Sequence, residues 1–452
     1  MSTSSEPGEI PAIDAEAVSL DIASSAAEAA TEGEVSGGKR ALGGMLQPFK
    51  VRNFCLLFGG QTVSTIGDAL YAVALPWLIL SNGGSAQEIG VVLAVYGIPR
   101  VGCVLLGGWL SDRLRPRRLM LIADTIRAVL VGILAGLALH GHPALWQLCA
   151  VAFPLGACMG LFLPASSAFL PDLLKDEELQ AGNALTFSST QAATLVGSAI
   201  AGVVVAVLTS GTAMALDALS FVVSAVSLAM MRVSRVVATG TPEEATGAAS
   251  GAAESSQGQI TFGRYLRTSR LMQVALVVSL AANFCFGGLM EVALPTLVHG
   301  PMNAGAGGYG LILAAFGGGA LAGSLFAGML GRLKRKGLIA LLLLLVMAVM
   351  IALLPYGGVA GAAFCMLISG VTNSISNVLL ITVIQLIIPR HLMGRAMGLL
   401  LFGSFGTYPI SVALAGVLTN HFGPVILFPF SGLVLFLTIL LGIAQKELRD
   451  LQ

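Results

Sequence analysis

Apolar stretches of membrane-spanning length, separated by short polar segments, follow one another along almost the whole chain. A stretch of about 20 apolar residues is long enough to cross the hydrocarbon core of a bilayer as an α-helix. Because most connecting segments are short, consecutive helices must run antiparallel. The pattern predicts an all-α polytopic membrane protein with twelve transmembrane helices, near residues 54–80, 88–110, 119–139, 145–169, 184–208, 212–231, 271–297, 309–330, 338–355, 359–387, 395–418 and 423–444.

The composition of the chain agrees with a membrane location. Hydrophobic residues make up 56% and charged residues 10% of the sequence, whereas soluble domains carry about 25% charged residues. The six cysteines lie inside apolar stretches without metal-ligand spacing, so we expect them to be small packing residues and expect no metal site. No stretch matches the G-x-x-x-x-G-K-[ST] pattern of a nucleotide site. We therefore expect no nucleotide, no nucleic acid and no cofactor.

Two long polar segments divide the chain. The first 38 residues carry eight acidic side chains and no Lys or Arg, in a background of Ser, Ala, Glu and Gly. Such a composition predicts a disordered tail, and it lacks the basic start and apolar core of a signal peptide. A second segment is rich in Gly, Ala, Ser and Thr, which is typical of a flexible linker. The predicted organisation is an acidic tail (1–46), a first six-helix bundle (47–231), a linker (232–270), a second six-helix bundle (271–445) and a C-terminal segment (446–452).

An internal repeat relates the two predicted bundles. The end of the first span, VALPWLIL (73–80), resembles the end of the seventh, VALPTLV (292–298). GGWLSDRLRPRR after the second span corresponds to AGMLGRLKRK after the eighth, and PDLLKDEEL after the fourth corresponds to PRHLMGRAM after the tenth. The shift is about 220 residues in all three cases. Parallel halves of this kind place a substrate path between them, near the middle of the bilayer.

The positive charges predict the orientation of the protein. With the N-terminus in the cytoplasm, 22 of the 24 Lys and Arg residues fall in cytoplasmic segments. The other two, Arg100 and Arg127, lie inside spans. Cytoplasmic loops of membrane proteins carry an excess of Lys and Arg. We therefore expect a multi-pass protein of the cell membrane with both termini in the cytoplasm.

The stretch GGWLSDRLRPRRLM (107–120), between the second and third spans, is similar to the signature loop of the major facilitator superfamily. Gly108, Asp112, Arg113 and Arg117 occupy positions of that motif. Within the superfamily, other stretches resemble the drug:proton antiporter-3 family, which includes macrolide-efflux proteins and the enterobactin exporter. They are STIGDALYAVALPWLIL (64–80), IADTIRA (122–128), LPASSAFLPDLLKDEELQAGNAL (163–185), DALSFVVSA (217–225) and GRAMGLL (394–400).

This resemblance implies the major facilitator fold, in which two pseudo-symmetric six-helix bundles move a substrate by alternating access. It also implies that Asp112 helps to close the cytoplasmic side, by contacting Arg113, the third helix and the start of the eleventh. The alternative to this gating role is that the arginines of this loop only anchor the turn in the cytoplasm. Ser198 stands where the antiporter motif of the fifth helix usually carries proline, so the direction of transport stays open.

Charged residues inside the predicted spans are candidates for function, because a charge at bilayer depth costs roughly 3 kcal/mol or more. Asp68, Arg100 and Arg127 all lie near the middle of the bilayer. We hypothesise that Asp68 gains and loses a proton during transport, while the two arginines control its affinity for protons. The alternative is a fixed salt bridge that locks the first three helices together. Asp124, nearer the inner face, is expected to pair with Arg127 or the arginine-rich loop, or to join the coupling network.

Two further acids, Asp217 and Glu291, sit differently, because both lie within about two turns of the outer face, on the sixth and seventh spans. They are candidates to recognise a cationic substrate or to receive protons from outside; alternatively, they only reach the outer interface. The uncharged polar residues within the spans are candidates to line a cavity, although hydrogen bonding between helices is their commoner fate. These residues are Gln61, Asn283, Asn373, Asn377 and Gln385.

These observations favour a monomeric secondary transporter that acts on a small-molecule substrate and protons within the lipid bilayer. The best-supported interpretation is proton-coupled export of an amphipathic small molecule, such as an antibiotic, a drug or a siderophore. A carrier of the same fold with another direction or coupling, for a lipid or a metabolite, is the alternative. A membrane enzyme or sensor is disfavoured because no cluster of His, Asp or Cys residues marks a catalytic face and no catalytic residue is expected.

Overall fold

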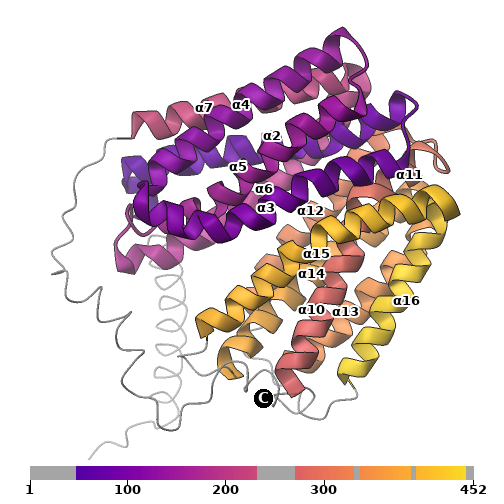
Figure 1. Ribbon diagram of the computed structural model, residues 1–452. Coiled ribbons are helices and arrows are strands. Elements are labelled where there is room, and N and C mark those ends of the chain that lie inside the picture. The colour runs from indigo at the N-terminus through magenta and orange to yellow at the C-terminus, as the bar shows by residue number, and fades with distance from the viewer. Residues whose placement is uncertain (1–46, 232–269, 330–335, 388–392, 444–452) are drawn as a thin grey trace, which may run out of the picture.

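The computed structural model describes residues 47–231, 270–329, 336–387 and 393–443, and these residues are almost entirely helical (Figure 1). The acidic tail, the linker up to residue 269 and the segment 446–452 lie outside the described residues. The described part begins with a short 3-10 helix, η1 (Gln47–Lys50). It continues with α2 (Arg52–Ser81), α3 (Ala86–Arg113), α4 (Pro116–His140), α5 (Leu145–Phe169), α6 (Asp176–Val207) and α7 (Ser210–Met230). After the linker come α10 (Arg270–Gly288), η2 (Leu289–Ala293), α11 (Leu294–His299), α12 (Gly305–Met329), α13 (Lys336–Leu353), η4 (Leu354–Tyr356), α14 (Gly358–Ile387), α15 (Met393–Phe422) and α16 (Pro424–Ile443).

Twelve helical segments within the described residues are long and apolar enough to cross a membrane, which confirms the predicted number of spans. The largest difference in a boundary is at α6, which begins at Asp176 and not near residue 184. The Glu178 carboxylate accepts a hydrogen bond from the backbone N–H of Lys175, 3.3 Å away, and so caps this helix. The first two turns of α6 are polar, so hydropathy alone does not reveal them.

The seventh span is interrupted, which the sequence does not predict. The π-helical turn η2 separates α10 from α11, and Pro295 stands in the first turn of α11. Proline has no N–H to donate to the carbonyl four residues earlier, and its ring crowds that carbonyl. The carbonyl concerned is that of Glu291, within the π turn. Proline therefore favours an irregular backbone around this acid.

The outer surface of the molecule carries many large apolar side chains. Val207, Leu325 and Leu441 are 74%, 67% and 71% exposed, respectively. Side chains of this kind are stable in contact with lipid tails but costly in contact with water. This surface agrees with a protein embedded in a bilayer.

Helices α2 to α7 form the first half of the molecule and α10 to α16 the second half, and most helix packing stays within a half (Figure 1). The main contacts between the halves are those of α3 with α15 and of α6 with α12. Helices α3 and α12 hold equivalent places in the internal repeat, as do α6 and α15. The repeat therefore relates the contact of α3 with α15 to the contact of α12 with α6.

Glycines allow the backbones to approach closely at both crossings. A Cβ atom on Gly310 of α12 would lie 2.5 Å from Cα of Gly202 on α6, and one on Gly90 of α3 would lie 3.0 Å from Cα of Gly416 on α15. Gly90 and Gly310 lie near the starts of α3 and α12, and Gly202 and Gly416 lie near the ends of α6 and α15. From there α3 and α15 diverge toward the opposite end of the molecule (Figure 1). The halves thus meet closely near one end of the spans.

We expect Gly310→Ala to weaken the contact between the halves. The added methyl group would lie 2.5 Å from Gly202 Cα and 2.7 Å from the Ser198 carbonyl oxygen, and overpacking of this kind costs about 1–3 kcal/mol. The thermal unfolding temperature of the purified protein in detergent should fall. Gly136→Ala on α4 is the matched control, because no atom lies within 4 Å of its added methyl group. Equal unfolding temperatures for the two variants would contradict this interpretation of the crossing.

Candidate functional site

A cavity of about 220 Å³ lies between the two halves. Helices α2, α3, α4, α5 and α7 of the first half form most of its wall, and η2 and α15 of the second half complete it. Much of the wall is apolar, with side chains such as Leu75, Val92 and Phe221. The polar part consists of five charged residues and three tyrosines, namely Asp68, Arg100, Arg127, Asp217, Glu291, Tyr71, Tyr96 and Tyr408.

The structure places the two acids of the sixth and seventh spans in one cavity with Asp68. Asp217 on α7 and Glu291 on η2 line the same cavity as Asp68 on α2, which the sequence does not predict. The reason is tertiary: α7 packs along α2, and η2 contacts both α2 and α3. Position along a span fixes the depth of a residue, but it carries no information about which helices are neighbours.

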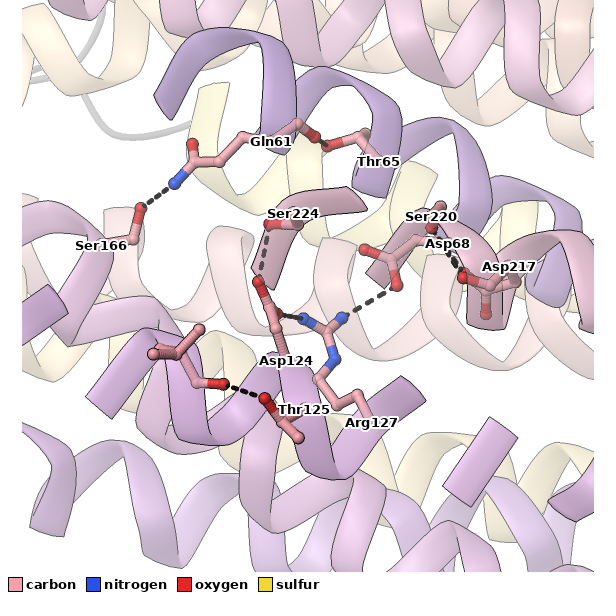
Figure 2. Close-up of polar contacts among 11 residues, drawn as sticks. Gln61, Thr65, Asp68, Asp124, Thr125, Arg127, Ser166, Asp217, Ser220 and Ser224 are labelled. Carbon is pink, nitrogen blue, oxygen red and sulfur yellow. Dashed lines mark hydrogen bonds and ion pairs between the residues drawn. The ribbon is translucent and has the colours of Figure 1, made fainter. Parts of the chain in front are cut away.

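Arg127 is the centre of a buried polar network (Figure 2). Its Nη2 atom donates to Oδ1 of Asp68 at 2.9 Å, and its Nη1 atom donates to Oδ1 of Asp124 at 3.3 Å. The Ser224 hydroxyl on α7 donates to the other oxygen of Asp124 at 2.7 Å. The network therefore joins α2, α4 and α7. This confirms the expected pairing of Asp124 with Arg127.

The arginines also contact aromatic rings. The guanidinium carbon of Arg127 lies 4.0 Å from the ring centre of Phe221 on α7, which is within cation–π range. That of Arg100 lies 4.8 Å from Phe405 on α15 and 5.9 Å from Tyr96 on its own helix. The Nε atom of Arg100 is buried without a hydrogen-bond partner among the described residues. The salt bridge of Arg127 with Asp68 thus joins the first and third spans. The second span takes part differently, because its Arg100 contacts the ring of Phe405 in the other half.

Asp217 occupies a different environment from Asp68. It is 1% exposed, and the Ser220 hydroxyl donates to its Oδ1 atom at 3.3 Å. Both side chains pack directly against the backbone of Gly67 on α2, where a Cβ atom would overlap them. In the described part of the chain, no ion pair is formed by Asp217. Its carboxyl group lies beside the helix that carries Asp68, with a hydroxyl group as its partner (Figure 2).

The part of the wall that comes from the second half is held in place by Ser411 on α15. Its hydroxyl accepts a hydrogen bond from the Gly288 N–H at 2.8 Å and donates one to the Phe284 carbonyl on α10. These bonds attach α10 to α15 immediately before the π turn that carries Glu291. The position of Glu291 in the cavity wall thus depends on contacts between helices that lie far apart in the sequence.

Among the uncharged polar candidates whose side chains the structure describes, none lines this cavity. Gln61 donates to the Ser166 hydroxyl at 2.8 Å and so links α2 to α5. Asn283 is exposed and donates to the Ser279 carbonyl of its own helix. Asn377 is also exposed, and the side chain of Gln385 lies outside the described part of the structure.

Arg117 of the predicted gate motif contacts the end of a neighbouring helix. It donates to the carbonyl oxygens of Leu228 and Ala229, at 2.7 and 2.8 Å, at the C-terminal end of α7. A cation is favourable there because the last carbonyls of a helix have no partner within it. Arg113 is exposed at the end of α3. The surroundings of Gly108 and the side chain of Asp112 lie outside what the structure describes, so the gate itself stays a prediction.

Sequence reasoning missed several residues of the site. Ser220 and Ser224 follow Asp217 at intervals of three and seven, which places all three on one face of an apolar helix. This helical spacing is a usable signal. Tyr96, Phe405 and Tyr408 carry no such signal, because aromatic side chains in a span are equally compatible with contact to lipid.

Comparisons with known proteins agree with this architecture. The multidrug efflux pump Tap of Mycobacterium tuberculosis is 27% identical over 413 residues, which are 88% of this chain and 94% of that protein. Macrolide efflux protein A of Streptococcus pyogenes is 24% identical over 183 residues, 40% of this chain and 45% of that protein. The crystal structure of the nucleoside transporter NupG is similar in fold, with a TM-score of 0.65 at 13% identity, and covers 87% of this chain and 99% of its own.

The family assignment rests on a match over most of the chain. Residues 57–407 match the family model of the Major Facilitator Superfamily, and this range includes Asp68, Arg100, Asp124, Arg127, Asp217 and Glu291. The chain belongs to the Major Facilitator Superfamily, and it is a membrane transporter and not an enzyme.

Proposed function

We propose that this transporter exports amphipathic small molecules in exchange for protons, by alternating access. The observation that carries the proposal is the cavity between the two halves, which combines an apolar wall with ionisable groups. An amphipathic substrate gains from both kinds of surface. Asp68 is 43% exposed in its side chain and lines this cavity, so water and substrate can reach the same carboxyl group.

Two observations support export as the direction. Relatives that match 88% of this chain are described as multidrug efflux pumps, and another relative is described as a macrolide efflux protein. The distribution of Lys and Arg favours cytoplasmic termini. The halves then meet near the outer face and diverge toward the cytoplasm, which suits loading of substrate from inside the cell.

The charged residues of the cavity divide into roles in this proposal. Asp68 exchanges the proton, and its affinity for protons is controlled by Arg127, which binds its carboxylate, and by Arg100, which lines the same cavity. Glu291 and Asp217 recognise a positively charged part of the substrate. Glu291 is the acid that the second half contributes, so a substrate bound to it contacts both halves. Asp112, with Arg113 and Arg117, closes the cytoplasmic side in the opposite conformation.

Transport by everted membrane vesicles tests the function directly. In vesicles energised by respiration, the protein should drive accumulation of at least one member of a panel that contains ethidium, a macrolide and a catecholate siderophore. Collapse of the proton gradient by an uncoupler should abolish this accumulation. Accumulation that withstands the uncoupler would favour a carrier with another coupling, and no transport of any member would contradict the proposal.

We expect Asp68→Asn to abolish accumulation against a gradient while leaving substrate binding intact. Asparagine keeps an oxygen that can accept the hydrogen bond from Arg127, but it cannot gain or lose a proton. Accumulation in energised vesicles should fall to the level seen with uncoupler. Glu177→Gln, at an exposed position at the start of α6, is the control and should transport normally. Uncoupler-sensitive accumulation by Asp68→Asn would disprove the assigned role.

Glu291→Gln should weaken binding of cationic substrates selectively. A hydrogen bond to a charged group contributes about 1.5–3 kcal/mol, which corresponds to a loss of affinity of roughly tenfold to a hundredfold. Binding of an uncharged substrate should change little, and Glu291→Asp should retain part of the affinity for cations. Affinities can be measured with purified protein in detergent by fluorescence anisotropy. An equal loss for charged and uncharged substrates would indicate a structural effect only.

A further inference from the structure

Arg127 binds its two acids through different nitrogen atoms. Nη2 contacts Asp68 and Nη1 contacts Asp124, so one contact can break without disturbing the other (Figure 2). The guanidinium also lies 4.0 Å from the ring centre of Phe221 and is 5% exposed. A cation in this environment needs an anionic partner at all times, because removing one member of a buried ion pair is strongly unfavourable.

The two acids differ in accessibility. The Asp68 side chain is 43% exposed and lines the cavity, whereas that of Asp124 is 0% exposed and is not part of the cavity wall. Asp124 accepts a hydrogen bond from Ser224 in addition to its contact with Arg127. Protons from the cavity can therefore reach Asp68, while Asp124 is shielded and its oxygens are already occupied.

The two acids also differ in how they are attached to Arg127. Asp124 and Arg127 are three residues apart on α4, so they face the same side of one helix and keep this relation whenever the helix moves. Asp68 comes from α2. A small shift of α2 relative to α4 changes its distance to the guanidinium without affecting the pair on α4.

We propose that Asp124 is the resident counter-ion of Arg127, which keeps the guanidinium neutralised when Asp68 takes up its proton. Asp124 then takes no part in proton exchange, although it belongs to the same network. This inference rests on the proposed proton coupling and assigns different roles to two acids that the sequence places in one group.

A proton from the cavity binds the Asp68 carboxylate, which becomes a neutral carboxyl group and releases Nη2 of Arg127. The ion pair of Arg127 with Asp124 stays neutral as a unit, and the cavity gains one positive charge. Loss of the proton from Asp68 restores the contact with Nη2.

Other groups around Asp68 do not replace Asp124. Asp217 is buried beside Gly67 and receives its hydrogen bond from Ser220, with no ion pair to Arg127 in the described part of the chain. Arg100 contacts Phe405 and Tyr96. The charged and titratable groups near Asp68 are Arg127 and Asp124 on α4, Arg100 and Tyr96 on α3, Tyr71 on α2, Asp217 on α7, Glu291 on η2 and Tyr408 on α15.

Infrared difference spectroscopy of the purified protein in lipid, as a function of pH, tests the proposal. Protonated carboxyl groups give a band separate from that of carboxylates, and Asp68→Asn identifies the contribution of Asp68. We expect Asp124→Asn to retain the full amplitude of the Asp68 band and to shift its midpoint to lower pH by about one unit or more, a tenfold higher proton concentration. The reason is that protonating Asp68 would then leave Arg127 without an anion.

Two further variants separate this role from a general disturbance of the fold. Asp124→Glu keeps the charge and should restore the midpoint toward that of the natural protein. Arg127→Gln removes the cation and should shift the midpoint in the opposite direction, to higher pH. The inference would be overturned if Asp124→Asn left the midpoint unchanged, raised it or removed part of the band. It would also be overturned if the natural protein showed no band that Asp68→Asn removes.

The same experiment is independent of transport. The band reports the protonation of Asp68 in the absence of substrate, whereas the vesicle assay reports export. Failure of transport together with the expected shifts would reject the proposed function and keep the assignment of Asp124. Proton-coupled transport without the expected shifts would keep the proposed function and reject the assignment of Asp124.

Discussion

A guanidinium group at bilayer depth is the constraint on which the rest of the site depends. A charge there costs roughly 3 kcal/mol or more unless it finds partners, and Arg127 is almost completely buried. Its partners are Asp68 on α2, Asp124 on α4 and the ring of Phe221 on α7. Satisfying one cation therefore requires three helices of the first half to pack in one arrangement. The hydroxyl of Ser224 completes the arrangement from α7.

The same packing makes the cavity unequal between the two halves. The first half supplies both arginines and most of the wall, and the second half supplies Glu291 and Tyr408. The halves also touch at two glycine crossings, of which that between Gly202 and Gly310 is one. In the proposed cycle, motion at these crossings changes the position of Glu291 and Tyr408 relative to the substrate. The network around Arg127 lies entirely within the first half, so it moves together with that half.

Much of the fold follows from hydropathy, because each span must satisfy its own backbone hydrogen bonds within the membrane. Hydropathy misses the start of α6 because its first two turns are polar, and it misses the π turn because that turn is as apolar as the helix around it. The charged residues inside the spans can also be recognised from the sequence, because a charge within an apolar stretch is costly and therefore rare. The pairing of Asp124 with Arg127 was predictable because three residues separate them on a helix. That Asp217 and Glu291 join Asp68 depends on contacts between distant helices, which one sequence does not reveal.

In the proposed cycle, protons and substrate exchange through this one cavity. Coupling is reciprocal, so a substrate gradient must drive protons as surely as protons drive substrate. The most direct measurement uses purified protein in liposomes that contain a pH-sensitive dye, with an exported compound imposed as the only gradient. We expect movement of the compound to drive protons in the opposite direction, and Asp68→Asn to abolish this proton movement. Movement of the compound with no accompanying change in internal pH would contradict it.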